Sequence, residues 1–341
     1  MPNFTPLIHP WNQEIWQNLT LEPERSNHAL LFNGDAGLGK RDTAFALAHF
    51  VLCDTNSQSE TLFNAGSHPD LHVIMPEAEI QEGLLGEFAK RYIEQHSGKP
   101  KKTITIEQVR RLSQSLDTHP HISTHRLILI FHAETMNRNA ANALLKSLEE
   151  PPANTLFLIV TDELSKLAKT IRSRCSLVSF RQPDFASAKA WLELNGTLPA
   201  SDIDTYLSMS NNQPLEAIRL FDEDYLGALK TVFTDVNNLW MRKAEVTRVA
   251  KNWQDLGSSK AVDILQKLAT DLLRNSLTDS PKSVFFPVQQ SWVNSVASKF
   301  SKAKILGLVD ELNYAKRMLA TTVDELLVLE TVSNKLSKLP S

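Results

Sequence analysis

The sequence predicts an α/β protein, in which a parallel β-sheet with helices on both faces comes first and mostly helical structure follows. Three observations predict this class. Short apolar runs alternate with helical patterns up to residue 180, a glycine-rich loop lies between the first such run and the first long helical pattern, and strand-like runs become scarce after residue 180. Strands separated by helices of this length favour a parallel sheet, because parallel strands need a crossover between them.

The strands of this sheet are predicted from their apolar runs. They are expected at residues 29–32, 71–75, 126–131, 155–160 and 176–180. The third run, RLILIF, is almost continuously apolar, as expected for a strand covered on both faces.

The first helices are also predicted from local sequence features. Residues 41–53 are rich in alanine and contain no glycine or proline, and a second apolar face begins at Ile106. Residues 139–149 repeat apolar residues at the i, i+3, i+4, i+7 spacing and stop before Pro151. The segment 77–103 fits no simple strand–helix unit, and we interpret it as an inserted helix followed by a basic turn.

The second half is predicted to be helical. Pro183 and Asp184 are a plausible boundary and helix start, and a short helical region reaches about Leu220. Later, one apolar stripe is formed by Ile305, Leu308, Val309 and Leu312. A further helix is expected to begin with Val323, Leu326, Leu327 and Glu330 and to continue toward Leu336.

Composition predicts an ordinary globular protein with more than one domain. The chain has 341 residues, of which 42% are hydrophobic and 22% charged, and a formal net charge of −3. A chain of this length is too long to fold around one ordinary hydrophobic core. The small negative net charge argues against a protein that binds nucleic acid over its whole surface. Cys53 and Cys175 alone cannot form a zinc site and suggest no disulfide framework. No apolar stretch could span a bilayer and the N-terminus does not read as a signal peptide, so we expect a cytoplasmic location and no membrane contact.

The glycine-rich loop GDAGLGKR, residues 34–41, is typical of a phosphate cradle. Gly34, Gly37, Gly39 and Lys40 have the required spacing between a strand and a helix. Such a loop turns backbone N–H groups toward phosphate oxygens, and the lysine adds a positive charge. The alternative is a glycine-rich turn with a chance lysine.

The same loop lacks the groups that hold magnesium. The residue after the lysine should carry a hydroxyl, but Arg41 has only donors, and the strand at 126–131 ends in Phe131 and His132 rather than in acids. We expect the side chain of Thr43 to point away from the magnesium position. We expect Glu134 to be a helix-start or surface residue. Two separate changes in one site predict that ATP is not hydrolysed here, and no metal site is predicted.

Residues 137–175 carry the most specific motifs. The runs NALLKSLEEPP and SRC together resemble the clamp-loader branch of the AAA+ proteins, and AGSHPD at 65–70 and HPWNQEIWQNL at 9–19 are similar too. The resemblance covers residues 1–180. It implies an AAA+ phosphate-loop domain at 1–182 with a degenerate site, a small helical lid at 183–222, and a helical collar for oligomerisation at 223–341.

The resemblance also implies a function. The chain would be a non-hydrolysing subunit of the clamp loader of bacterial DNA polymerase III, with no ATPase or polymerase chemistry of its own. Its implied partners are the clamp-loader ATPase subunits of the gamma and tau type and a delta-type subunit, in a hetero-pentameric ring that loads a sliding clamp on primed DNA. ATP would be bound by the neighbouring subunits.

The arginine of SRC, Arg174, is implied to act in trans. In the family it reaches the γ-phosphate held by a neighbour, where its charge offsets the charge of the transferred group. We expect a helix with the buried stripe Leu164, Leu167 and Ile171 to orient the Arg174 side chain. We expect Arg172 to lie on a nearby face and to assist Arg174.

Two departures from the family are expected. The lid position at which active members carry an arginine falls on Leu215 in an approximate alignment, and the four-cysteine zinc module has only Cys53 left, so no zinc is predicted.

Other readings stay open. The chain could be an active AAA+ ATPase that uses Thr43 or Glu134, or a scaffold in which Arg174 is structural. Histidines 119, 121 and 125 favour a loop rather than a metal site, and the basic run at 98–102 favours a solvated turn over a DNA contact.

Overall fold

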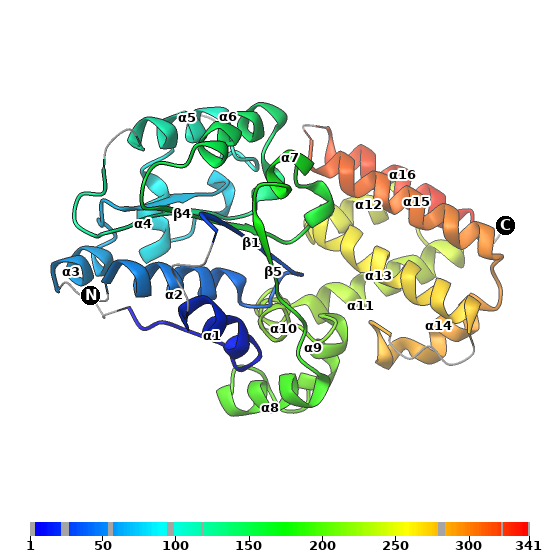
Figure 1. Cartoon of the computed structure of the whole chain (residues 1–341). Coiled ribbons are helices and arrows are strands. Elements are labelled where there is room, and N and C mark those ends of the chain that lie inside the picture. The colour runs from blue at the N-terminus through cyan, green and yellow to red at the C-terminus, as the bar shows by residue number, and fades with distance from the viewer. Residues whose placement is uncertain are drawn as a thin grey trace. The chain divides into compact units, whose positions relative to one another are not determined.

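The computed structural model describes residues 4–21, 27–53, 57–93, 99–116, 119–278, 284–321 and 323–339. The chain divides into two compact units, residues 1–182 and residues 183–341 (Figure 1). The boundary predicted at residue 222 lies inside the second unit and stays a prediction.

The first unit is built on the predicted parallel sheet, which is confirmed. Its five strands follow the order β2-β3-β4-β1-β5, and every neighbouring pair is parallel. The strands are β1 (Ala29–Asn33), β2 (Leu71–Ile74), β3 (Arg126–Ile130), β4 (Thr155–Thr161) and β5 (Ser176–Ser179). Because all strands run the same way, the segments that follow β1, β3 and β4 meet at one edge of the sheet.

Helices cover both faces of the sheet (Figure 1). Successive side chains of a strand point to opposite faces, so Leu30 and Phe32 belong to one core and Ala29 and Leu31 to the other. The first face packs against α1 (Gln13–Leu21), α2 (Lys40–Cys53), α3 (Ser57–Asn64) and α4 (Leu84–Lys90). The second face packs against α5 (Ile106–Ser115), α6 (Arg138–Glu149) and α7 (Lys169–Arg172).

Caps set the starts of two helices. The side chain of Thr105 accepts a hydrogen bond from the backbone N–H of Gln108, and the side chain of Gln108 accepts one from the backbone N–H of Thr105, so α5 begins with a capping box. Asn137 accepts a hydrogen bond from the backbone N–H of Ala140 at 2.8 Å, so α6 begins one residue earlier than predicted.

The prediction that one helix carries Leu164, Leu167 and Ile171 as a single buried stripe is wrong. Leu164 lies in a 3₁₀ turn, η5 (Leu164–Lys166), Leu167 is extended, and Ile171 lies in the four-residue helix α7. Leu167 and Ile171 are nonetheless both buried against the sheet, with Leu164 packed beside them. The three apolar residues therefore reach the core from a turn and a short helix, and not from one continuous helix.

The inserted segment 77–103 contains a 3₁₀ turn, η3 (Glu77–Glu79), and α4. Directly after α4, the guanidinium of Arg91 donates hydrogen bonds to the backbone oxygens of Gly66 and His68, each at 2.9 Å. The inserted helix thus fastens the AGSHPD segment. The predicted basic turn lies partly outside the described residues.

The second unit is helical, as predicted. Asp184 caps its first helix by accepting a hydrogen bond from the Ser187 backbone at 2.9 Å, in agreement with the expected helix start. The helices are α8 (Phe185–Asn195), α9 (Ile203–Met209), α10 (Pro214–Asp222), α11 (Tyr225–Trp240), α12 (Val246–Asp255), α13 (Ser258–Leu277), α14 (Gln290–Ala297), α15 (Lys302–Leu319) and α16 (Glu325–Ser337), with the 3₁₀ turn η6 (Pro287–Gln289) before α14.

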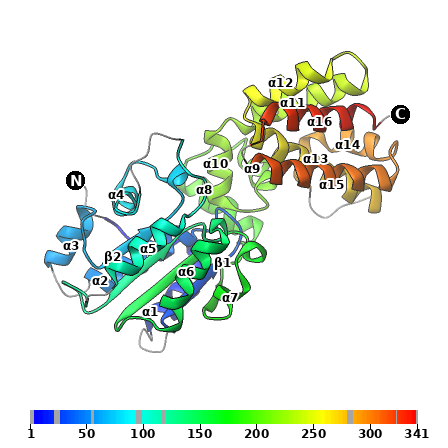
Figure 2. The same cartoon turned by 90° about the horizontal axis from the view of Figure 1, so that it is seen from above.

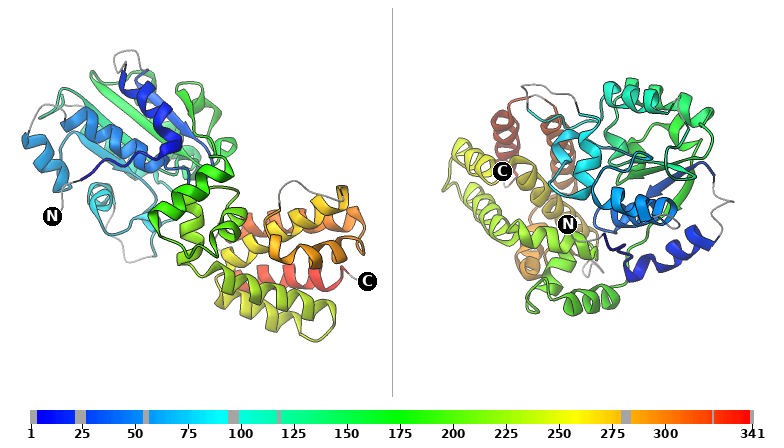
Figure 3. Two further views of the ribbon diagram at one scale, coloured as in Figure 1. Left: turned by 90° about the horizontal axis from the view of Figure 1, so that it is seen from below. Right: turned by 90° about the vertical axis from the view of Figure 1, so that its left-hand side faces the viewer.

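These helices share one hydrophobic core, in which α13 packs along α15 and α12 along α16 (Figures 2 and 3). The predicted stripe of α15 is confirmed, with Ile305, Leu308 and Leu312 buried. The further helix expected toward Leu336 is confirmed as α16, although it begins at Glu325, after Val323, and Leu327 is 59% exposed. Within the described residues, no helix combines the length and the apolar character that crossing a bilayer requires.

Candidate functional site

The loop of residues 34–41 links β1 to α2 at the carboxyl edge of the sheet. Gly37 and Gly39 have φ values of 76° and 78°, which glycine adopts without strain. A Cβ on Gly39 would also lie 2.3 Å from the His9 ring, and a Cβ on Gly34 would lie 2.7 Å from the Phe180 backbone oxygen. Backbone conformation and close packing therefore both require glycine here.

The N-terminal segment packs directly on this loop. The side chains of Trp11 and Asn12 both donate to the backbone oxygen of Leu38, at 3.0 and 2.8 Å. His9 Nε2 lies 2.9 Å from Asp42 Oδ2 at the start of α2. The HPWN run thus fixes the shape of the loop from outside.

Lys40 is held by its own chain. Its ammonium group lies 2.6 Å from the backbone oxygens of Gly34 and Asp35 and 2.7 Å from Asp162 Oδ1. An ammonium has three protons, and three oxygens take them. The side chain is only 4% exposed, so a phosphate would have to replace protein oxygens to reach it.

Arg41 and Phe131 occupy the two positions at which magnesium ligands were expected, and they contact each other. The guanidinium carbon of Arg41 lies 5.5 Å from the centre of the Phe131 ring, a cation–π contact. Burial lowers the pKa of Arg41, although Asp42, Glu79 and Asp162 oppose this shift. The two changes are therefore not separate, because they form one contact.

Thr43 is also unavailable as a metal ligand in this arrangement. Its side chain is fully buried in α2, and its hydroxyl donates a 2.9 Å hydrogen bond to the backbone oxygen of Gly39.

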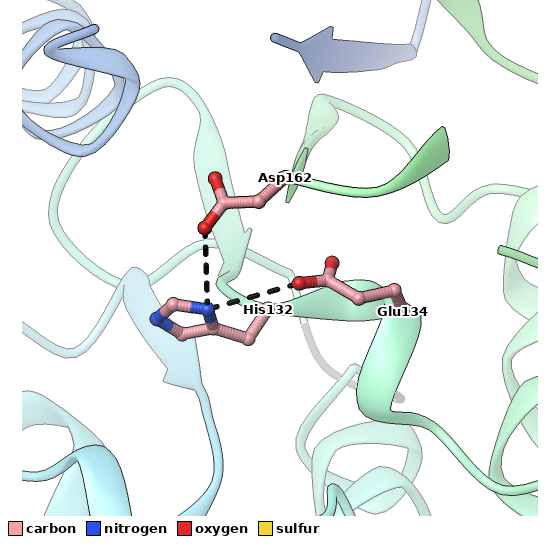
Figure 4. A group of neighbouring side chains, drawn as sticks. All are labelled: His132, Glu134 and Asp162. Carbon is pink, nitrogen blue, oxygen red and sulfur yellow. Dashed lines mark ion pairs between the residues drawn. The ribbon is translucent and has the colours of Figure 1, made fainter. Parts of the chain in front are cut away.

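His132, Glu134 and Asp162 gather beside Lys40 (Figure 4). His132 follows β3, Glu134 lies in the 3₁₀ turn η4 (Ala133–Thr135), and Asp162 follows β4. His132 Nδ1 is 3.8 Å from Glu134 Oε1 and 3.9 Å from Asp162 Oδ2. Among the described residues, this is the one group of three histidine, cysteine or acidic side chains with donor atoms within 4.8 Å of one another.

Glu134 is not the surface residue that was expected. Its side chain is 9% exposed, and Oε2 accepts a 2.6 Å hydrogen bond from the Thr161 hydroxyl. Burial raises the pKa of Glu134, but His132 and Thr161 lower it by more, so its pKa ends below the ordinary value. Glu134 in turn raises the pKa of His132 against the effect of burial.

Sequence reasoning missed Asp162. A signal was available, because Asp162 follows β4 as His132 follows β3, and adjacent parallel strands bring such positions together.

Arg174 lies just after α7. Its Nη1 donates to the Thr170 backbone oxygen at 2.9 Å, and its Nη2 forms an ion pair with Glu149 at the end of α6. The arginine side chain is 34% exposed and that of Glu149 is 50% exposed. The nearby Arg172 and Lys169 line a cavity of about 360 Å³ with Leu177 of the edge strand β5. Arg174 is thus partly exposed, and its partners Thr170, Ser173 and Glu149 lie outside the loop of residues 34–41.

Other sequence candidates have structural roles. The Asp70 carboxylate is fully buried and accepts hydrogen bonds from the backbone N–H groups of residues 121–123, at 2.6 to 2.9 Å. AGSHPD therefore anchors the histidine-containing loop. Burial raises the pKa values of Cys53 and Cys175 to about 12 and about 11, so both are thiols at neutral pH. Leu215 lies in the first turn of α10.

Known proteins resemble this chain in sequence. Residues 11–184, half of the chain, match the family described as "DNA polymerase III, delta subunit". A DNA polymerase III subunit delta' of Pseudomonas aeruginosa is 28% identical over 98% of this chain and 98% of its own length. The DNA polymerase III subunit delta' of Escherichia coli is 29% identical over 66% of this chain and 64% of its own length. A solved structure, a DNA polymerase III gamma subunit-related protein of Thermotoga maritima, is 18% identical over 96% of this chain and 99% of that one, with a TM-score of 0.45. The resemblance inferred from the sequence is confirmed, and the chain belongs to the DNA polymerase III delta subunit family.

Proposed function

We propose that this chain is a non-hydrolysing subunit of a clamp loader and lends Arg174 to the ATP site of a neighbouring subunit. The observation that carries the first half is the contact between Arg41 and Phe131. It fills the two positions from which a phosphate-loop protein holds magnesium with a cation and an apolar ring. Neither group can donate an electron pair to a metal.

The state of Lys40 supports the same conclusion. Its three hydrogen-bonded oxygens belong to the protein, and one of them is a carboxylate. Binding a triphosphate would cost these contacts and would bring negative charge beside Asp162. Gly34, Gly37, Gly39 and Lys40 therefore serve as a folded remnant of a nucleotide site, without productive Mg·ATP.

Arg174 has the properties that a donated arginine needs. It is partly exposed, and exposed ion pairs such as that with Glu149 are worth only about 0.2–1 kcal/mol, so the guanidinium can exchange partners at low cost. Its planar fork suits a phosphate better than a lysine would. An arginine supplied in trans accelerates phosphoryl transfer by roughly 10³- to 10⁵-fold.

The implied partners follow from the same proposal. We infer a cytoplasmic hetero-pentameric ring with ATPase subunits of the gamma and tau type and a delta-type subunit, which places a sliding clamp on primed DNA. ATP belongs to the neighbours. The chain has two cysteines, so a four-thiolate zinc module is not part of this function.

Reconstitution with the ATPase subunits tests the proposal. The isolated chain should release no phosphate from ATP with or without primed DNA. In the ring, Arg174→Ala should lower DNA-stimulated turnover at least tenfold at unchanged assembly. Arg110→Ala, which alters an exposed arginine of α5, is the matched control and should leave turnover unchanged.

Each alternative gives a different result. Turnover by the isolated chain that Lys40→Ala abolishes would show an active ATPase. Weaker assembly by Arg174→Ala at an unchanged rate per complex would show a scaffold. Either result would overturn the corresponding half of the proposal.

A further inference from the structure

We propose that His132, Glu134 and Asp162 form a binding site for a divalent transition-metal ion of the zinc class. This inference goes beyond the proposed function and does not depend on it, since the ion would bind without nucleotide. It replaces the expectation of no metal at one place in the fold, the carboxyl ends of β3 and β4.

The spacing of the three side chains carries the proposal. His132 Nδ1 faces Glu134 Oε1 at 3.8 Å and Asp162 Oδ2 at 3.9 Å, both too long for hydrogen bonds (Figure 4). All three donor atoms lie within 4.8 Å of one another, which is close enough for them to share one ion. Zinc bonds of about 2.0–2.2 Å place the donors of a tetrahedral site about 3.4 Å apart. Rotations that move each donor by less than about 1 Å would close this site.

Each carboxylate is already oriented by a neighbour. Glu134 uses Oε2 to accept from Thr161 and turns Oε1 toward His132. Asp162 uses Oδ1 to bind Lys40 and turns Oδ2 toward His132. Metal ligands in proteins are commonly held this way by outer hydrogen bonds.

The donor set selects the class of ion. One imidazole nitrogen with two carboxylate oxygens suits zinc, cobalt, manganese or ferrous iron, whereas magnesium prefers oxygen ligands alone. The two carboxylates and Lys40 sum to one negative charge, which a cation complements. His132 and Asp162 are 31% and 30% exposed, so an ion can enter and keep water in its open positions.

Cobalt titration of the full chain tests the site, because bound Co²⁺ absorbs visible light. We expect one Co²⁺ per chain, displaced by Zn²⁺. His132→Asn should weaken binding at least tenfold. Asparagine is the appropriate replacement, because residue 132 has a φ of 54°, a left-handed conformation that asparagine tolerates.

Two further variants separate the site from general effects. His125→Asn removes an exposed histidine and should leave Co²⁺ binding unchanged. Thr161→Val, which frees Glu134 Oε2, should weaken binding about tenfold, as loss of an outer partner does at other sites. Circular dichroism of each variant shows that it is folded.

The proposal is overturned if the wild-type chain binds no Co²⁺, because the three side chains would then form only a cluster of ion pairs. It is equally overturned if His132→Asn and the wild type bind Co²⁺ with the same affinity, because the ion would then lie elsewhere, for example on a cysteine.

Discussion

Replacing Glu149 with glutamine tests how tightly Arg174 is held before it acts. The substitution removes the charge of the partner but keeps its size, while the bond from Arg174 Nη1 to the Thr170 backbone oxygen stays. Both side chains of the ion pair are at least one third exposed. Solvent screens such pairs, whose measured worth is about 0.2–1 kcal/mol, a factor of about 1.4 to 5 in an equilibrium.

This magnitude sets the expected result. If Arg174 must leave Glu149 to reach a neighbour's phosphate, Glu149→Gln raises the ATP turnover of the reconstituted ring by up to about fivefold. Urea unfolding of the isolated variant should change by less than about 1 kcal/mol. Arg174→Ala, measured in the same assay, should fall at least tenfold and shows that the assay detects the arginine. A tenfold or larger fall for Glu149→Gln would refute the reasoning, because Glu149 would then aim Arg174.

Three further predictions concern the first unit. Asp70→Ala leaves the three backbone N–H groups of residues 121–123 unpaired and should lower the free energy of unfolding by about 3–5 kcal/mol in urea; a loss below 1 kcal/mol would contradict the anchoring role. Burial lowers the pKa of His72 to about 3. As the pH falls, His72 therefore binds a proton near pH 6.5 in the unfolded chain but only near pH 3 in the folded chain. The free energy of unfolding should fall by roughly 1.4 kcal/mol per pH unit between pH 6.5 and about 3. Denaturant titrations across this range should show a shallower decline for His72→Gln. Finally, Arg41→Ser restores a hydroxyl after Lys40 but leaves Phe131 in place, so phosphate release from ATP should stay absent, and magnesium-dependent turnover would contradict this account of the site.

Strand positions could be predicted from the sequence to within a residue or two. For β1, β2, β3 and β4 the reason is that these strands are buried on both faces, whereas the edge strand β5 is only partly buried. A strand such as β3 then carries an unbroken apolar run that a surface element would not have. Helix α6 was predictable for a different reason, since its apolar face repeats over a full 12 residues. Helix α7 was not, because four residues give too little sequence to distinguish one helix from a turn followed by a short helix.

The site was predictable only where its chemistry is local. The spacing of the glycines predicts the conformation of the loop, because residues adjacent in the sequence form that conformation. The contact between Arg41 and Phe131 joins residues 90 positions apart, and the approach of Asp162 to His132 depends on β3 and β4 being neighbours in the sheet. The approach of Asp162 to His132 is signalled only by their places after β4 and β3, and the strand order is needed to turn that signal into a contact.

Lys40 and the glycines of the phosphate loop have structural roles within the first unit. The ammonium of Lys40 joins the loop after β1 to Asp162 after β4, two strands that are neighbours in the sheet. Replacing Lys40 would take one donor away from the Asp162 carboxylate and from two partly buried backbone oxygens. The glycines are fixed in the same way by the backbone conformation at Gly39 and by the close approach of Phe180 to Gly34. The loop sequence is therefore retained by packing and hydrogen bonding within the chain, and its persistence is no argument for bound nucleotide.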